Sequence, residues 1–378
     1  MKNIYIIRDC YIPNIASINR CLALAKGMGE LGVTVKIVFI YPNTTKDKVK
    51  NFYKNVDFIY LWDSFSPKNK YLKHLVSRFF LLFYVVRLKK NETVLLYGTI
   101  NPWYAFLFNP ALKVFNEITE HPSVHIHNNK FIGKLQYYFF KKFCLKINGI
   151  ITITPSLSKF FIDEFGIKKE KVTTINMIVD SVRFENIEIK ERKNTITYCG
   201  TISESKDGII YLLNAFKTVL NQHPEMKLTL IGGFESAQTK DNVYKLIQTF
   251  SIKDNVIITG EVSSDEMPIL LAESKLLVLS RPNSIQAQYG FPTKLGEYLM
   301  TKNPIVITDV GDFKMYLKDK HDIIYTIPND AEDFAAKINW VLNNYSIALQ
   351  IGSNGKNVAM QSFNYKIEAR KLLDFTNI

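Results

Sequence analysis

The residues whose types and spacing best suit chemistry follow the strand-like run of residues 276–280. Pro292 opens a predicted helix that carries Lys294 and Glu297, and Gly290 precedes it. Proline suits a first helical turn because its missing N–H would be unbonded there, and glycine lets a ligand approach the backbone. A helix start at the carboxyl end of a parallel strand binds anions. This segment is therefore interpreted as a site for a nucleotide diphosphate, with the phosphates at the helix start and Glu297 facing the ribose.

Three further sets of residues follow apolar, strand-like runs in the second half of the chain. They are Gly200 and Thr201 with Lys206, then Gly232, then Val262. In an open α/β sheet, ligands bind outside the carboxyl ends of the strands, where all four sets are expected. A lysine in a turn before a helix can meet phosphate as a point charge, although Lys206 taken alone also fits a solvated loop. The agreement of the four sets predicts one ligand site.

Short apolar runs alternate with helical periodicity along the chain. The runs cover residues 4–7, 35–40, 58–61, 94–97, 114–118 and 150–153, then 196–199, 228–231, 256–258, 276–279, 305–307 and 323–327. Near-continuous apolar strands between helices indicate parallel sheets covered on both faces. We predict an α/β protein with two doubly wound domains, residues 1–182 and 183–359. A C-terminal helix within residues 360–378 is expected to rejoin the first domain.

One glycine motif is set aside. Residues 27–32 read GMGELG, which matches the dinucleotide-binding pattern G-x-G-x-x-G. That pattern needs a strand before it and a helix after it, whereas here a helix over residues 17–28 comes first and a strand follows. The glycines are therefore interpreted as a helix stop and a turn.

The positive charge lies in the first half of the chain. The net charge is +13, with +14 in residues 1–182 and −1 in the remainder. Residues 64–91 and 121–162 contain no acid, and the helices expected at 68–90 and 130–146 mix lysines with aromatic residues. Such helices suit an anionic membrane surface. Nucleic acid is a weaker alternative because no nucleic-acid motif accompanies the charge, and amphipathic helices with solvated lysine rims are a third interpretation.

The cysteines and the apolar runs indicate in which cellular compartment the protein is expected. Cys10, Cys21, Cys144 and Cys199 show no metal-ligand spacing, which predicts reduced and mostly buried thiols. The first residues pass directly into a strand-like run, so no signal peptide is expected. The longest strong apolar run, residues 79–86, is far shorter than the roughly 20 residues that span a membrane. We expect a cytoplasmic protein, peripheral on the inner face of the cell membrane.

Several segments of the chain resemble a known family. The segments YCGTISESKDGIIYLLNAF, LTLIGG, VIITGEV and GFPTKLGEYLMTKNPIVITDVG, in this order, are similar to the donor half of retaining glycosyltransferases of the GT-B fold, specifically glycosyltransferase family 4. ITITPSLSKFF and VDSVRF resemble the family's segment before the interdomain crossing. The resemblance implies two Rossmann-like domains that face each other across a cleft. It also implies a nucleotide diphosphate sugar, a UDP or GDP sugar, as donor, with neither metal nor further cofactor.

The resemblance also assigns residues. It implies donor contacts from Gly200, Thr201, Lys206, Gly232, Val262, Gly290, Phe291, Pro292, Lys294 and Glu297, and acceptor contacts from Pro13 and Asn14. Two positions depart from the family pattern. Thr201 replaces a common arginine, which leaves the diphosphate to Lys206, with Lys294 as a candidate helper. Tyr289 replaces a glutamate that usually touches the donor sugar, so Gln286 or Gln288 is considered for that contact.

Glu120 and His121 are the catalytic candidates. They follow the run of residues 114–118, where the family places an acidic residue or a histidine facing the anomeric carbon of the donor. A carboxylate there could accept the acceptor's proton or stabilise positive charge, and a histidine can exchange protons near neutral pH. The alternative is a Glu120–lysine pair and a loop histidine. His125 and His127 lack a third metal ligand and are interpreted as loop or strand-edge residues.

Three functions are carried forward. The leading hypothesis is a retaining hexosyltransferase that moves a sugar to a membrane-associated glycolipid or oligosaccharide acceptor in polysaccharide biosynthesis. A nucleotide-sugar 2-epimerase of similar fold would need more acids and histidines near the donor and no lipid surface. A non-catalytic membrane or partner-binding module is motivated by Thr201 and Tyr289.

Overall fold

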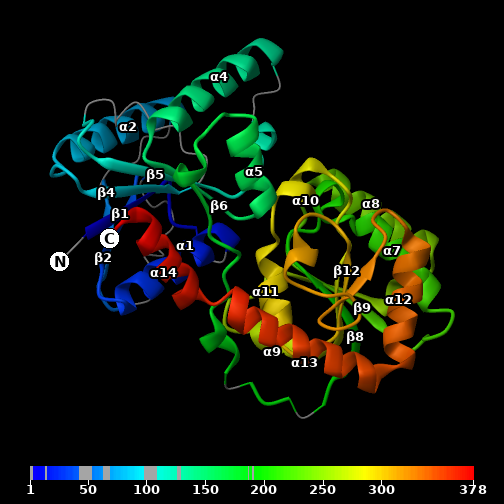
Figure 1. Cartoon of the computed structure of the whole chain (residues 1–378). Helices are drawn as coiled ribbons and strands as arrows, with labels where there is room; N and C mark the ends of the chain where they lie inside the picture. Colours follow the sequence, from blue (N-terminus) through cyan, green and yellow to red (C-terminus); the bar gives the residue numbers. More distant parts are fainter. Residues whose placement is uncertain are drawn as a thin grey trace. The chain divides into compact units, whose positions relative to one another are not determined.

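The computed structural model describes residues 3–12, 15–41, 53–62, 69–97, 109–125, 129–185, 187–189 and 191–378. Pro13, Asn14 and His127 lie outside this description. The chain forms two compact units (Figure 1): residues 1–178 with 365–378 make unit 1, and residues 179–364 make unit 2. The sequence predicts the boundary at residues 182 and 183 and the return from residue 360. The units divide four residues earlier, and the return begins five residues later.

Unit 1 contains a parallel sheet of seven strands in the order β3-β2-β1-β4-β5-β6-β7. The strands are β1 (Asn3–Arg8), β2 (Thr34–Phe39), β3 (Val56–Tyr60), β4 (Thr93–Tyr97), β5 (Lys113–Ile118), β6 (Gly149–Thr152) and β7 (Val172–Thr174). The apolar runs predict six of these strands. The seventh, β7, is three residues long and half-buried at the sheet edge, so it leaves no apolar run in the sequence.

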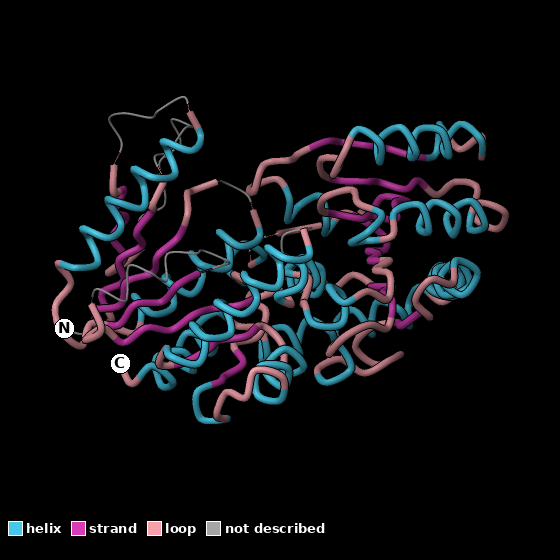
Figure 2. Tube along the Cα trace, turned by 90° about the horizontal axis from the view of Figure 1, so that it is seen from above, coloured by secondary structure: helices cyan, strands magenta, loops and turns pink. Residues whose placement is uncertain are grey.

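Helices cover both faces of this sheet (Figures 1 and 2). They are α1 (Ala16–Glu30), α2 (Lys70–Val86), α4 (Lys130–Lys146), α5 (Pro155–Asp163) and α14 (Tyr365–Thr376), with short 3-10 turns η1 (Pro122–His125) and η2 (Lys169–Lys171). In Figure 1, α1 and α14 lie on one face and α2 and α4 on the other. Asn69 and Asn129 cap the latter two, because each side chain accepts hydrogen bonds from the first backbone N–H groups of its helix.

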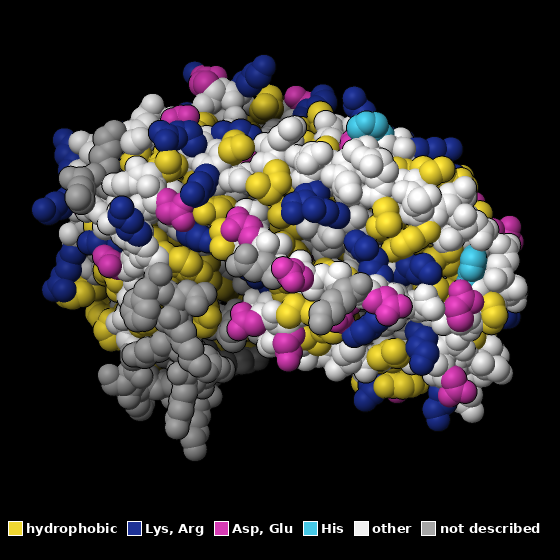
Figure 3. Space-filling model, turned by 90° about the horizontal axis from the view of Figure 1, so that it is seen from below, with side chains coloured by type: hydrophobic (Ala, Val, Ile, Leu, Met, Phe, Trp, Pro, Cys, Tyr) yellow, Lys and Arg dark blue, Asp and Glu magenta, His cyan; other side chains and the backbone are white. Residues whose placement is uncertain are grey.

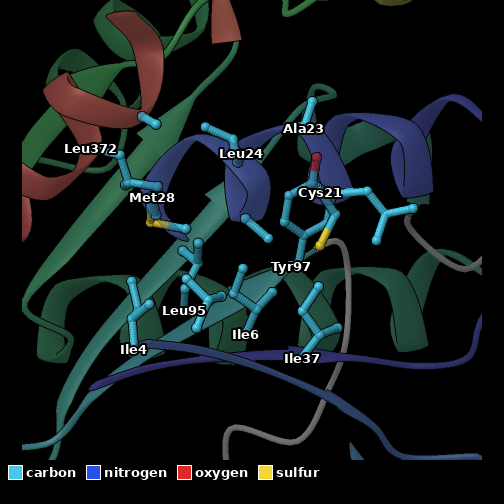
Figure 4. Close-up of a cluster of buried hydrophobic side chains, with 14 of the residues drawn as sticks. Ile4, Ile6, Cys21, Ala23, Leu24, Met28, Ile37, Leu95, Tyr97 and Leu372 are labelled. Carbon is cyan, nitrogen blue, oxygen red and sulfur yellow. The ribbon is translucent and has the colours of Figure 1, made fainter. Parts of the chain in front are cut away.

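The core of unit 1 lies between the sheet and α1 (Figure 4). Ile4, Ile6, Ile37 and Leu95 reach from the strands toward the apolar side of α1, and Leu372 of α14 closes the cluster. Each of these side chains is at most 1% exposed. Burial of apolar area of this extent is the main source of folding free energy.

The prediction that the glycines of residues 27–32 form a helix stop is wrong for the first two of them. The helix continues through Gly27 and Gly29 to Glu30, so these glycines do not end it. A Cβ on Gly27 would lie 2.7 Å from Cβ of Ala369, and one on Gly29 would lie 2.1 Å from the carbonyl oxygen of Lys54. Both glycines therefore permit close packing. Gly32, with φ of +90°, makes the turn.

A buried ion pair fixes the return of the C-terminal helix. Arg20, on α1, donates to Glu117 Oε1 at 2.7 Å and to the backbone carbonyls of Asn176 and Ile175. Glu368, on α14, accepts from the backbone N–H of Asn176 at 2.7 Å. The end of the first pass through unit 1 and the final helix are thereby held by the same charged cluster.

Unit 2 contains a second parallel sheet in the order β10-β9-β8-β11-β12-β13. The strands are β8 (Lys193–Cys199), β9 (Lys227–Ile231), β10 (Val256–Gly260), β11 (Ser274–Leu279), β12 (Ile305–Thr308) and β13 (Ile324–Thr326). All six match the apolar runs. With two parallel-sheet α/β units, the predicted fold class is confirmed.

The helices of unit 2 follow the strands. They are α6 (Glu204–Asp207), α7 (Ile209–Val219), α8 (Ala237–Thr249), α9 (Met267–Ala272), α10 (Ile285–Tyr289), α11 (Thr293–Met300), α12 (Ala331–Asn343) and α13 (Tyr345–Ser362), with 3-10 turns η3 (Ser181–Phe184), η4 (Lys253–Asn255) and η5 (Phe313–Met315). Periodicity in the sequence does not predict α10, because its five residues are too few to show a repeat.

Candidate functional site

Glycines join the carboxyl ends of three neighbouring strands of unit 2. Gly200 donates from its N–H to the carbonyl of Ile231 at 2.8 Å, and Gly232 donates to the carbonyl of Gly260 at 2.8 Å. Gly200 and Gly232 have φ of +141° and +134°. A Cβ on Gly232 would lie 2.1 Å from the Gly200 carbonyl oxygen. The strand ends therefore meet along bare backbone, as a site that admits a ligand requires.

The turn after Gly200 is packed against the end of β11. Ser280 donates from its hydroxyl to the carbonyl of Asp207 at 2.8 Å. Gly208, with φ of +60°, has no room for a Cβ, which would lie 2.4 Å from the Ser280 carbonyl oxygen. Lys206 itself is exposed, and its ammonium has no hydrogen-bond or ion-pair partner among the described residues.

The neighbouring residue, Asp207, is 1% exposed and forms a buried ion pair that the sequence analysis misses. Lys294 donates to Asp207 Oδ2 at 2.7 Å. The same ammonium lies 4.4 Å from the centre of the Tyr198 ring and donates to the Tyr198 hydroxyl at 3.1 Å. It also fills the space that a Cβ on Gly200 would need, 2.4 Å away. Lys294 is thus brought to the strand-end glycines.

The charges around Asp207 keep it ionised. Burial by itself would raise the pKa of the Asp207 carboxyl, but the positive charges of Lys294 and Arg281 and two hydrogen bonds outweigh it, so the pKa lies below its ordinary value. Arg281 Nε is 3.8 Å from Asp207 Oδ1. The carboxylate therefore balances two buried cations. An acid next to the glycine that opens an apolar helix was the available signal in the sequence.

Helix α11 begins where the sequence predicts, with one difference. Pro292 is the residue before the helix rather than its first residue, with φ of −72°. No side chain caps the helix start. Gly290 and Phe291 precede it; the Phe291 ring is buried and packs on Phe313 and Phe363, with ring centres 5.1 and 5.4 Å away. These aromatic contacts hold the loop that leads into α11.

The inner side of α11 belongs to the core of unit 2. Leu295, Tyr298 and Leu299 are fully buried. The Tyr298 hydroxyl accepts from the backbone N–H of Cys199 at 2.7 Å, so it also anchors the end of β8.

Glu297 lies one turn into α11 and is 21% exposed. Its Oε1 atom pairs with Arg183, a partner that the sequence analysis did not assign. Arg183 also donates to the carbonyl of Ser264 at 2.6 Å, in the loop after β10 that includes the half-buried Val262. Thr201 is exposed beside Gly200, and Tyr289 is half-buried at the end of α10. Unit 2 thus brings Gly200, Gly232 and Lys294 together. Arg183 separately links Glu297 to the loop that contains Val262.

The catalytic candidates lie in unit 1, after β5. Glu120 pairs with His125, with Oε2 and Nε2 2.8 Å apart. His121 Nδ1 accepts the backbone N–H of Ser123 at 3.2 Å, and its ring centre is 4.3 Å from that of Phe160. Burial lowers the pKa of His121. In a neutral ring, an Nδ1 atom that accepts this hydrogen bond leaves the ring proton on Nε2.

Most of unit 2 resembles a known protein family. Residues 181–358 match the sequence model of the family glycosyl transferases group 1. The match takes in every donor-binding residue predicted above, from Gly200 to Glu297.

Curated relatives and solved structures extend the similarity to unit 1. An uncharacterized glycosyltransferase of Methanocaldococcus jannaschii is 20% identical over 69% of this chain and 67% of its own length. The O-antigen chain mannosyltransferase RfbU of Salmonella typhimurium is 21% identical over 62% and 69%. The structure of Anabaena HepE in complex with UDP and glucose covers both chains completely, with 13% identity and a TM-score of 0.80. The whole chain has the GT-B fold. These similarities support a glycosyltransferase and do not favour the epimerase or the binding module.

Proposed function

We propose that the protein is a retaining, metal-independent glycosyltransferase of family 4. It transfers a hexosyl-type sugar from a UDP or GDP sugar to a membrane-associated glycolipid or oligosaccharide acceptor in polysaccharide biosynthesis. The observation that carries this proposal is the set of strand ends in unit 2. Bare backbone at Gly200 and Gly232 adjoins the half-buried ammonium of Lys294 and the uncapped start of α11.

The residues of unit 2 divide the donor among them. Lys294 and the first N–H groups of α11 are suited to the diphosphate, because a cation and a helix start both stabilise negative charge. Lys206, exposed at the preceding turn, supplies a second cation when the donor is bound. Glu297 accepts a hydrogen bond from a ribose hydroxyl. Gln286 or Gln288 takes over the sugar contact that Tyr289 cannot make.

Unit 1 supplies the groups for the reacting sugar. His121, with its proton on Nε2, donates a hydrogen bond to the sugar, and Glu120 accepts the proton of the acceptor hydroxyl or stabilises positive charge at the anomeric carbon. His125 holds the Glu120 carboxylate in place through its 2.8 Å contact. Pro13 and Asn14 remain predicted acceptor contacts.

The donor assignment is tested by release of nucleoside diphosphate. UDP and GDP sugars are incubated with the protein, with and without added membrane extract as a source of acceptor. We expect release from one nucleotide class, stimulated by the extract and reduced at least tenfold in Glu297→Ala, in line with the loss of a charge-assisted hydrogen bond. Glu332→Ala, an exposed glutamate of α12 in the same unit, is the matched control. No release from any donor would refute the proposal.

The acceptor side of the proposal rests on the exposed faces of α2 and α4. Large apolar side chains on both helices face solvent: Tyr71, Leu75, Phe79, Phe83 and Val86 on α2, and Phe131, Leu135, Tyr138 and Phe139 on α4. Tyr71 and Phe131 are 75% and 78% exposed. Neither helix contains an acidic residue. By contrast, the face of the molecule in Figure 3 carries acidic side chains among the basic ones.

This combination suits an anionic membrane surface. Aromatic rings occupy the headgroup layer, and nearby lysines meet the phosphates. The described residues contain no helix that is long and apolar enough to cross a membrane. The protein is therefore proposed to bind the inner face of the cell membrane peripherally.

Co-sedimentation with vesicles tests the membrane surface. We expect binding to vesicles that contain an anionic lipid, with a loss of binding as salt rises, because the electrostatic attraction is screened. Phe131→Ser and Lys134→Glu, both on α4, should weaken it. Ile327→Ser and Lys240→Glu place the same changes at exposed positions of unit 2 and should leave it unchanged. Binding that is indifferent to lipid charge would contradict this part of the proposal.

A further inference from the structure

Arg183 connects two parts of unit 2 that follow different strands. Its guanidinium pairs with Glu297 Oε1 on α11 and donates to the carbonyl of Ser264 at 2.6 Å, in the loop after β10. The paired side chains are 26% and 21% exposed, so the contact lies at the surface of the site rather than in the core. One side chain therefore bridges the predicted ribose-binding carboxylate and the loop that contains Val262.

The backbone that carries Arg183 is fixed on both sides. The N–H of Val179 donates to the carbonyl of Phe363 at 3.0 Å, and Phe184 is 6% exposed. Asp180 caps the intervening turn by accepting from the N–H of Val182. A short 3-10 turn between two anchors delivers the guanidinium to a defined place.

The pairing uses one oxygen of Glu297. Among the described residues, Oε1 accepts from Arg183 and Oε2 makes no hydrogen bond. A carboxylate whose first oxygen is fixed presents its second oxygen in a defined direction. An ionised carboxylate accepts hydrogen bonds and donates none, which matches a pair of ribose hydroxyls.

We infer that Arg183 is a positioning residue for the nucleoside end of the donor. This inference rests on the proposed function, because it assumes that Glu297 faces the ribose. Arg183 aims Glu297 at the ribose hydroxyls and holds the loop of Val262 and Ser264 at the same time. The planar fork of a guanidinium can serve both partners, whereas a lysine ammonium offers one point charge.

The opposite possibility is that Arg183 occupies the carboxylate and must be displaced by the nucleoside. The two interpretations predict opposite changes in nucleotide affinity when Arg183 is removed. A positioning residue strengthens nucleotide binding, so its removal weakens it. An occupant competes with the nucleotide, so its removal strengthens binding.

Calorimetric titration with UDP, GDP and their 2′,3′-dideoxy counterparts separates these cases. We expect Arg183→Met to weaken binding of the ribose nucleotide about tenfold or more, the usual range for a charge-assisted hydrogen bond, and to change the dideoxy nucleotide much less. Arg183→Lys should restore part of the discrimination. Arg370→Met, which removes an exposed arginine of unit 1, should bind like the wild type. Thermal unfolding of each variant confirms that it folds, and Arg183→Lys serves as the test if Arg183→Met does not.

Each other outcome has a distinct meaning. Equal weakening of ribose and dideoxy nucleotides would overturn the inference, because Arg183 would then act on the fold of the site alone. Tighter binding in Arg183→Met would overturn it in favour of an occupant. A wild-type protein that binds neither UDP nor GDP would instead refute the proposed function, and the inference with it.

Discussion

Both units of the molecule hold a buried ion pair near the carboxyl ends of their strands, but the two pairs differ in exposure. In unit 1, the side chains of Arg20 and Glu117 are 2% and 0% exposed. In unit 2, the side chain of Asp207 is 1% exposed, whereas that of Lys294 retains 14%. The first ion pair is inaccessible to solvent. The second is partly exposed, beside the strand-end glycines.

The partners of each pair explain the difference. The other N–H groups of Arg20 donate hydrogen bonds to the carbonyls of Ile175 and Asn176. These bonds fix the chain where it leaves unit 1. Lys294 lies beside Gly200, and its side chain keeps 14% of its surface exposed. The same chemistry therefore serves architecture in one unit and is available to a ligand in the other. A buried charge indicates a binding site only when one of its partners still reaches the surface.

The largest loss of stability is expected from breaking the fully buried Arg20–Glu117 pair. Arg20→Met leaves Glu117 charged and fully buried, which should cost about 3–5 kcal/mol of unfolding free energy. Chemical denaturation measures this loss. The affinity of the folded fraction for nucleoside diphosphate should not change, and a change would show that unit 1 influences the donor site.

Lys294→Met should have a smaller effect on stability and a larger one on binding. Because Lys294 is partly solvated, and Arg281 still faces Asp207, the expected loss is about 2–3 kcal/mol. Affinity for nucleoside diphosphate should fall at least tenfold. If both Lys294→Met and Arg20→Met leave affinity unaltered, the contrast drawn between the two pairs is wrong.

The strand-end glycines allow a matched comparison. Gly232→Ala places a Cβ 2.1 Å from the Gly200 carbonyl oxygen at a φ of +134°, whereas Gly260→Ala at +73° has open space around it. Strain at both sites and overpacking at the first predict a difference of about 1–3 kcal/mol between the variants, measured by thermal unfolding. Equal losses would mean that the strand ends separate to admit the methyl group.

The smallest effect concerns pH. The folded-state pKa of Asp207 lies below its ordinary value of 3.8, so its stabilisation is complete above that value and is lost as the pH falls through the lowered pKa. Stability measured between pH 5 and pH 3 should therefore fall less steeply in Asp207→Asn than in the wild type. An identical slope would show that other carboxyl groups dominate the acid response.

Much of the fold follows from local patterns in the sequence. Apolar runs located all strands of unit 2 and most of those in unit 1, because buried parallel strands are continuous stretches of apolar residues. The glycines after β8 and β9 and the helix opening near Pro292 were equally visible. Short elements such as β7 and α10 were not, since three to five residues carry no period.

The pairing of charged groups was decided by the tertiary structure. Lys206 and Asp207 are adjacent, yet one faces solvent and the other balances two buried cations. Arg183 meets Glu297 114 residues later, and Arg20 meets Glu117 97 residues later. Local periodicity says which residues belong to a strand or a helix, so the sequence by itself determined the two sheets and the strand-end glycines on which the proposed donor site rests. Which charges meet depends on how distant elements pack, and only the folded chain brings those partners within hydrogen-bonding distance.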